Sequence, residues 1–167
     1  NLNDLPIPTI VKVQGAAFGG ALGLIACCDI AIASDNANFC LSEVKLGLAP
    51  ATIGPFVIEA IGARRCRELF LTARVFISSE AFQYGLVHHV VNLENLNNKV
   101  DETLSQILQS GPLASRAAKK LIKDINKPKE NLSEMTSSLI AELRVSKEGQ
   151  EGLTAFFEKR SPSWRNE

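Results

Sequence analysis

Apolar positions follow two different spacings along the chain, and the spacing changes at about residue 93. Before that point, short apolar runs predict strands at 9–13, 29–34, 38–41 and 86–91. Helices are predicted between them at 55–61, 64–71 and 80–84, and Ser78 or Ser79 could cap the last of these. A glycine-dense turn at 15–23 opens into a further helix that runs to Cys28. Alternating strands and helices predict an α/β fold.

From about residue 93 the pattern is helical throughout. Apolar residues recur at helical spacing within 100–108, 114–125, 132–143 and 153–157. Gly111-Pro112 and Lys127-Pro128-Lys129 separate three of these segments. We therefore expect two regions, 1–92 and 93–167, and expect the helical faces of the second to pack on the first or on another subunit.

Composition narrows the classes of partner. The 18 Lys+Arg balance the 18 Asp+Glu, and no long basic block is present, which argues against binding nucleic acid through its phosphates. The uncharged run 15–28 contains four glycines and is shorter than the roughly 20 residues that span a bilayer. We expect neither a nucleic-acid nor a membrane partner.

The four cysteines, at positions 27, 28, 40 and 66, form neither a CxxC pair nor a zinc-ligand spacing. We expect them to be reduced and buried, as in a cytoplasmic or equivalent reducing compartment. The chain begins at Asn1 and its one methionine is Met135, so we expect it to be an N-terminally truncated piece of a longer protein.

The glycine-dense turn runs from Gly15 to Gly23, between a predicted strand and a predicted helix. It matches neither GxGxxG nor a P-loop. Glycines at a helix start let a ligand oxygen approach unpaired backbone N–H groups, which is how an oxyanion hole is built. The alternative is that the glycines only permit tight helix–strand packing, and the spacing leaves both readings open.

Several segments together resemble the enoyl-CoA hydratase/isomerase (crotonase) superfamily, over nearly the whole chain and in order. They are Gly15-Ala16-Ala17-Phe18-Gly19-Gly20-Ala21-Leu22-Gly23-Leu24, Ala26-Cys27-Cys28-Asp29-Ile30-Ala31-Ile32-Ala33, Phe39-Cys40-Leu41-Ser42-Glu43-Val44-Lys45-Leu46-Gly47-Leu48-Ala49-Pro50, Ala60-Ile61-Gly62, Leu71-Thr72-Ala73 and Ala155-Phe156-Phe157-Glu158-Lys159-Arg160. Within the family, the details look closest to a methylglutaconyl-CoA hydratase-like branch.

The resemblance implies a fold and an assembly. The family fold is a spiral of ββα turns followed by a helical region that drives trimer formation, and only the later turns and the helices are expected in this chain. It implies a homotrimer or a dimer of trimers, an acyl-CoA thioester as substrate, and no metal or other cofactor. The compartment would be the cytoplasm, or the mitochondrial matrix in a eukaryote.

The resemblance also assigns two catalytic positions. The N–H of Gly20 would hold the thioester oxygen, with a second donor in a stretch preceding Asn1. Glu43 would move the proton. From the residues alone, a carboxylate beside apolar Leu41, Val44 and Leu46 would be desolvated, which suits a general acid/base; alternatively, Glu43 only caps the short turn that leads to Leu46.

Hydratases of the family commonly use a second glutamate, and Gly23 stands in its place. Either one glutamate suffices for hydration, or the enzyme is a double-bond isomerase that relies on Glu43, or the truncated chain is inactive. The missing side chain at Gly23 would enlarge the acyl pocket for a bulky or branched group, and Ala51 in place of a usual glycine would reshape it.

Further substrate contacts follow from the resemblance, at Phe18, Gly19, Ser42 and Leu48. Phe156 and Lys159 lie one helical turn apart and could contact CoA, within the subunit or across a subunit boundary; alternatively, they are a core aromatic and a surface lysine. His88 and His89 point to opposite faces of a strand and cannot form a compact metal pair alone, so structural roles are expected. Lastly, Arg64, Arg65 and Arg67 could meet a CoA phosphate, but a solvated helix face is expected.

Overall fold

The structure is a computed structural model that describes residues 2–125 and 131–165. It divides the chain into two compact units, one of Asn1–Leu5 with Thr9–Glu102 and one of Pro6–Pro8 with Thr103–Glu167. Each unit is described by itself. The predicted break at Lys127-Pro128-Lys129 lies outside the described residues.

The first unit contains two small sheets. One has the order β1-β3-β6 and is parallel; the other has the order β2-β4-β5, in which β2 and β4 are parallel and β4 and β5 antiparallel. The strands are β1 (Ile10–Val13), β2 (Ala16–Phe18), β3 (Ile30–Ser34), β4 (Asn38–Cys40), β5 (Phe76–Ile77) and β6 (His89–Val91).

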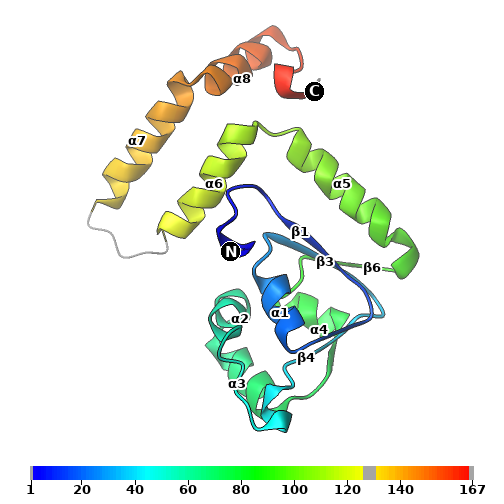
Figure 1. Ribbon diagram of the computed structural model, residues 1–167. Helices are drawn as coiled ribbons and strands as arrows, with labels where there is room; N and C mark the ends of the chain where they lie inside the picture. The colour runs from blue at the N-terminus through cyan, green and yellow to red at the C-terminus, as the bar shows by residue number, and fades with distance from the viewer. Residues whose placement is uncertain (1, 126–130, 166–167) are drawn as a thin grey trace. The chain divides into compact units, whose positions relative to one another are not determined.

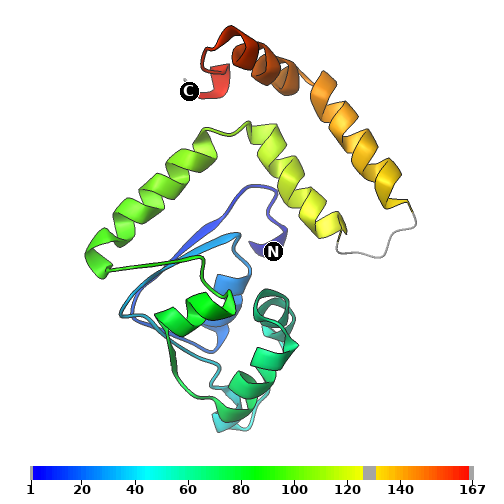
Figure 2. The same cartoon turned by 180° about the vertical axis from the view of Figure 1, so that it is seen from behind.

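Four helices flank these strands, namely α1 (Gly20–Ala26), α2 (Gly54–Ile61), α3 (Ala63–Thr72) and α4 (Ser78–Tyr84). α1 lies in front of the strands in Figure 1, whereas α4 comes forward in Figure 2, so the strands run between these two helices. The core between them is apolar: Leu22, Ile32 and Phe39 are fully buried, and the Phe39 and Phe76 rings stack with centroids 5.5 Å apart. This arrangement confirms the α/β prediction.

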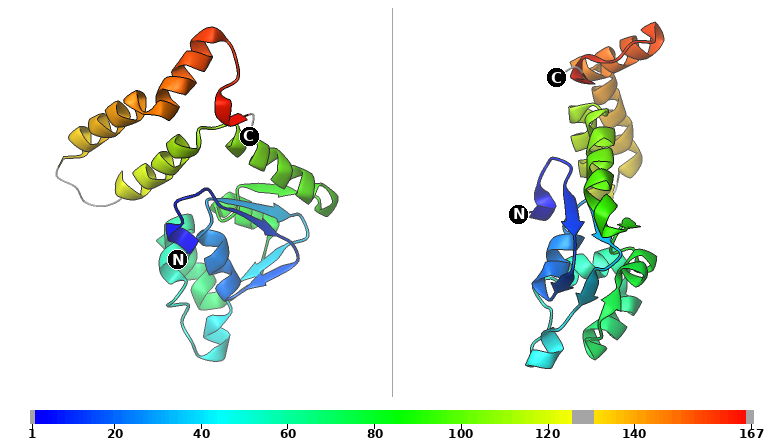
Figure 3. Two further views of the ribbon diagram at one scale, coloured as in Figure 1. Left: turned by 45° about the horizontal axis from the view of Figure 1, so that its top comes forward. Right: turned by 90° about the vertical axis from the view of Figure 1, so that its right-hand side faces the viewer.

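α5 (Leu96–Leu108) begins in the first unit and ends in the second. The second unit continues with α6 (Pro112–Ile125), α7 (Leu132–Val145) and α8 (Lys147–Glu158). α7 and α8 follow one another directly at Ser146, as Figure 3 shows. The Glu148 carboxylate on α8 accepts hydrogen bonds from the N–H groups of Leu113 (2.8 Å) and Ala114 (2.7 Å), and so caps the start of α6.

The structure corrects several local predictions. The short strands β2 and β5 were not predicted, and the last strand begins at His89 instead of residue 86. Neither serine caps α4 through its side chain: Ile77 is the N-cap residue, and its N–H donates to Glu80 Oε2 at 3.2 Å. The Ser78 hydroxyl is buried and donates instead to the Asp35 carbonyl at 2.8 Å.

Burial of the cysteines is mixed. Cys40 and Cys66 are buried, as expected, whereas Cys27 and Cys28 are only half-buried. All four are free thiols. Burial raises the pKa of the Cys66 thiol, and burial followed by the neighbouring Cys28 raises that of Cys27. Both therefore favour the protonated, less nucleophilic form.

Candidate active site

The ends of two parallel strands bring the glycine-dense turn beside the segment that carries Glu43. Phe18 of β2 pairs with Cys40 of β4, so both strands end at the same edge of the sheet. The Gly19 N–H donates to the Cys40 carbonyl at 2.8 Å and ties the two segments together there. Beyond this point β2 leads into α1, and β4 leads into the short 3-10 helix η2 (Glu43–Leu46). The topology thus places one helix start next to one carboxylate.

Gly19 allows the close approach at this edge. Its φ of 55° and ψ of −124° form a backbone conformation that side chains disfavour. A Cβ built on Gly19 would lie 3.6 Å from Glu43 Oε1 and 3.8 Å from Ser42 Oγ. The glycine therefore has the Glu43 carboxylate packed almost against its own backbone.

Gly20 is the first residue of α1, and its N–H is one of those for which a helix supplies no acceptor. No atom of the described residues lies within 4 Å of the place where a Gly20 Cβ would be, leaving out its chain neighbours and the helix backbone. This open space lets a ligand oxygen approach the helix start, where the dipole favours negative charge. The site therefore offers a hydrogen-bond donor and a carboxylate side by side.

Glu43 is half-buried, and its Oε2 atom is fully buried without a hydrogen-bond partner in the described part of the chain. The alternative role as a cap of the turn is not seen, because Ser42 is the N-cap residue of η2 and no side chain caps that helix. The expected apolar shell is wrong in part: Leu41 is buried, but Leu46 is 74% exposed and Val44 is also exposed. A buried carboxylate oxygen without a hydrogen-bond partner is costly to maintain, which marks Glu43 as a candidate functional residue.

The expectation that Gly23 enlarges the acyl pocket is wrong. A Cβ built on Gly23 would lie 2.7 Å from Ile53 Cβ and closer still to Ile53 Cγ2, so the Ile53 side chain already fills that space. Sequence reasoning missed Ile53, because nothing in the pattern indicates that a residue thirty positions later packs on this helix face.

The other predicted substrate contacts fall into two groups. Phe18 ends β2 with its side chain half exposed, Leu48 is 62% exposed, and Ala51 lies exposed in the turn before α2. Phe156 and Lys159 belong to the second unit, at the end of α8. Phe156 is 77% exposed, so it is not the core aromatic of the alternative interpretation, and both residues stay predicted CoA contacts.

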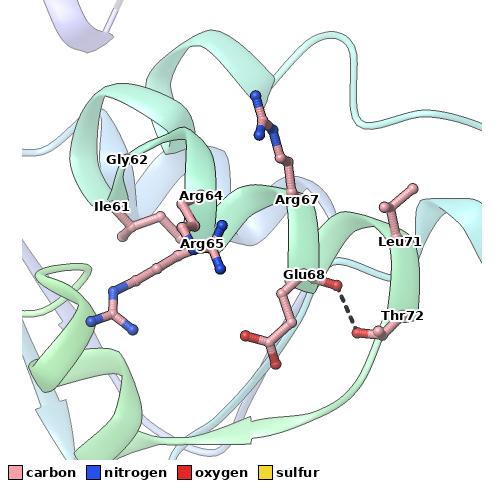
Figure 4. A pocket seen from close by; sticks show the side chains of 8 residues that line it. All are labelled: Ile61, Gly62, Arg64, Arg65, Arg67, Glu68, Leu71 and Thr72. Atoms are coloured by element: carbon pink, nitrogen blue, oxygen red, sulfur yellow. Dashed lines mark hydrogen bonds between the residues drawn. The ribbon is translucent and has the colours of Figure 1, made fainter.

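The three arginines line a cavity of about 790 Å³ along α3, and Glu43 is not among the residues that line it. Figure 4 shows the side chains of Arg64, Arg65 and Arg67 pointing in different directions. The Arg65 guanidinium lies 4.3 Å from the centroid of the Tyr84 ring. Since the guanidinium groups do not converge, this face lacks the geometry of a phosphate site.

His88 has a structural role. Its Nδ1 accepts from the Ala31 N–H at 3.0 Å, while its own backbone N–H donates to the Ala31 carbonyl at 2.8 Å. Burial, followed by the charges of Lys99 and His88, lowers the pKa of the neighbouring His89.

No helix within 2–125 or 131–165 is long and apolar enough to cross a bilayer.

Comparison with known proteins identifies the family to which this geometry belongs. The family model for enoyl-CoA hydratase/isomerase matches residues 1–167. Enoyl-CoA hydratase domain-containing protein 3, a mitochondrial protein of Xenopus laevis, is 32% identical over 161 residues, which are 96% of this chain and 55% of the relative.

Two crystal structures are also similar. A Legionella pneumophila protein described as an enoyl-CoA hydratase/isomerase (crotonase) has a TM-score of 0.93 and 49% identity. The match covers 98% of this chain and 64% of the Legionella chain. An enoyl-CoA hydratase of Shewanella pealeana has a TM-score of 0.92 and 47% identity. That match covers 98% of this chain and 62% of the Shewanella chain. In each case the chain spans less than two thirds of the protein that it matches.

Proposed function

The chain belongs to the enoyl-CoA hydratase/isomerase family and has its crotonase-like α/β fold, and from this premise we propose that it adds water across the 2,3 double bond of an enoyl-CoA thioester. One observation carries the proposal: the Glu43 carboxylate, with a buried and unpartnered Oε2, lies beside the open helix start at Gly20. A base next to an oxyanion donor is the pair that enolate chemistry needs.

The reaction follows from these two groups. The Gly20 N–H donates to the thioester oxygen and stabilises the negative charge that forms on it. The Glu43 carboxylate takes a proton from water while the water oxygen bonds to C3, and the electron pair of the C2=C3 bond moves into the enolate. Glu43 then returns the proton to C2, so the product is a 3-hydroxyacyl-CoA, one water heavier than the substrate.

Double-bond isomerisation is the second candidate, and the packing at Gly23 favours it. Position 23 is a glycine and Ile53 occupies the place of a Cβ there, so this position supplies no second carboxylate to act with Glu43. A single glutamate can remove a proton from C2 of a 3-enoyl thioester and return it to C4, with no change of mass. The two reactions therefore separate by product mass.

The finer assignments rest on the sequence resemblance. The proposed acyl group is a branched, glutaconyl-type one, although the filled space at Gly23 does not support it. The proposed assembly is a homotrimer or a dimer of trimers, with Phe156 and Lys159 contacting CoA. No metal or other cofactor is proposed, since the thioester carbonyl itself supplies the activation. The proposed compartment is the cytoplasm, or the mitochondrial matrix in a eukaryote; the Xenopus relative is named as a mitochondrial protein.

Product mass tests the proposal directly. Incubation with crotonyl-CoA, 3-methylglutaconyl-CoA and a 3-enoyl-CoA should give a product one water heavier from at least one of the first two. Glu43→Gln should lower the rate by about 10²–10⁴-fold, because it removes the general acid/base. Glu59→Gln changes an exposed residue of α2; it is the matched control and should keep the wild-type rate.

Three outcomes would contradict hydration in different ways. An isomerised product of unchanged mass would assign the second candidate. An undiminished rate in Glu43→Gln would remove Glu43 from the chemistry. The absence of any product from the wild-type chain would show that these 167 residues do not carry the activity.

A further inference from the structure

Ile53 packs directly on the backbone of α1. Its Cα would lie 3.6 Å from a Cβ on Gly23, and its side-chain atoms lie closer still, so Ile53 occupies the place that a Cβ at position 23 would take. Gly23 is buried and Ile53 is half-buried. The contact is therefore a fixed part of this helix face.

The start of the same helix carries the proposed reacting groups. Gly19 precedes α1 and contacts Glu43, while Gly23 lies one turn further along and contacts Ile53. The Glu43 carboxylate therefore lies against the N-cap of α1, and the Ile53 side chain lies against the helix four residues further along the chain.

We infer that Ile53 is a specificity-determining residue that ends the acyl site one helical turn beyond Glu43; this inference rests on the proposed function. An acyl group with its thioester oxygen at the Gly20 N–H and its C2 at Glu43 meets the Ile53 methyl groups as the chain extends. The apolar side chain has no donor or acceptor, so it limits the length of the acyl chain without taking part in proton transfer.

Substrate preference tests the inference. The ratio of kcat/KM for 2-hexenoyl-CoA to that for crotonyl-CoA should rise at least tenfold in Ile53→Ala, since space for one methylene changes discrimination by about 10–200-fold. Ile53→Val should shift the ratio in the same direction by less. Thr52→Ala, an exposed neighbour, should leave it unchanged. The affinities for butyryl-CoA and hexanoyl-CoA, measured by calorimetry, should follow the same order.

A pair of variants tests the contact itself. Gly23→Ala should lower the melting temperature by several degrees, because its methyl group overlaps Ile53, and the double variant Gly23→Ala/Ile53→Ala should recover most of that loss.

The outcomes separate the inference from the proposed function. Turnover of crotonyl-CoA with an unchanged ratio in Ile53→Ala would overturn the role of Ile53 alone, as would a double variant that is no more stable than Gly23→Ala. If wild-type protein neither binds nor converts any of these thioesters, the proposed function and the inference both fail.

Discussion

At the scale of single residues, the candidate site depends on three glycines, whose lack of a side chain leaves space beside the backbone. Gly19 and Gly23 admit Glu43 and Ile53 respectively, while Gly20 leaves its surroundings open. The sequence pattern predicted a glycine-dense turn before a helix, and the family resemblance assigned Glu43 to the same site. The pattern could not predict the contact at Gly23, because steric complementarity between residues far apart in the sequence does not change the local spacing of apolar residues.

Replacing Gly19 and replacing Gly20 should have different effects on the stability of the protein. Gly19→Ala should destabilise the protein by about 1–3 kcal/mol, because alanine is strained at its φ and ψ. Gly20→Ala should be neutral or slightly stabilising, because its backbone is helical and a methyl group meets no atom. Urea unfolding of both variants measures the difference, and equal midpoints would show that Gly19 is not strained.

His89 should make stability depend on pH. Burial, followed by the charges of Lys99 and His88, lowers the pKa of His89 in the folded state below its value in the unfolded chain. The folded state therefore binds a proton at His89 less readily than the unfolded chain does. The contribution of neutral His89 to the free energy of unfolding is therefore complete above pH about 6.5, and it is lost as the pH falls through the lowered pKa. Urea midpoints at pH 8 and pH 5.5 should differ more for wild type than for His89→Gln; the same difference in both proteins would refute this role.

At the scale of helices and strands, long apolar periodicities were predicted well and very short elements were missed. All four helical segments beyond residue 93 correspond to helices of the structure, from α5 to α8. β2 and β5 have three and two residues, too few to show an alternation of their own, and their extended conformation depends on pairing with β4. The cap of α4 was misassigned because Glu80 supplies the capping carboxylate from inside the helix.

The start of α6 should depend on a residue of another helix. Glu148→Ala should destabilise the second unit by about 1 kcal/mol, because two N–H groups of the first turn of α6 lose their acceptor. Glu142→Ala, on an exposed part of α7, is the matched control and should change stability by less than about 0.5 kcal/mol. Thermal unfolding followed by circular dichroism compares them, and equal melting temperatures would exclude the capping role.

At the scale of the whole molecule, the second unit leaves much apolar surface uncovered. Phe156 and Phe157 are 77% and 76% exposed, and their ring centroids lie 5.8 Å apart. The sequence pattern predicted amphipathic helices that need a partner. It could not identify that partner, because an apolar face has the same pattern whether it meets another domain or another subunit.

The proposed assembly predicts the mass in solution. Light scattering after size-exclusion chromatography should give a multiple of the 18.1 kDa chain mass. The double variant Phe156→Ser/Phe157→Ser should shift the distribution toward the single chain, because it removes apolar area from the interface. Leu71→Ser, which changes an equally exposed residue of α3, should not. A monomeric wild-type chain would contradict the assembly.

The backbone bond between Gly19 and Cys40 has a consequence for how such a site can diverge. It ties the segment that leads into α1 to the segment that leads into η2 through main-chain atoms, so it does not depend on which side chains surround it. Ile53 reaches the same helix from a separate segment that takes no part in that bond. Under the proposed function, an exchange of the residue at position 53 would change the acyl preference and leave this main-chain bond in place.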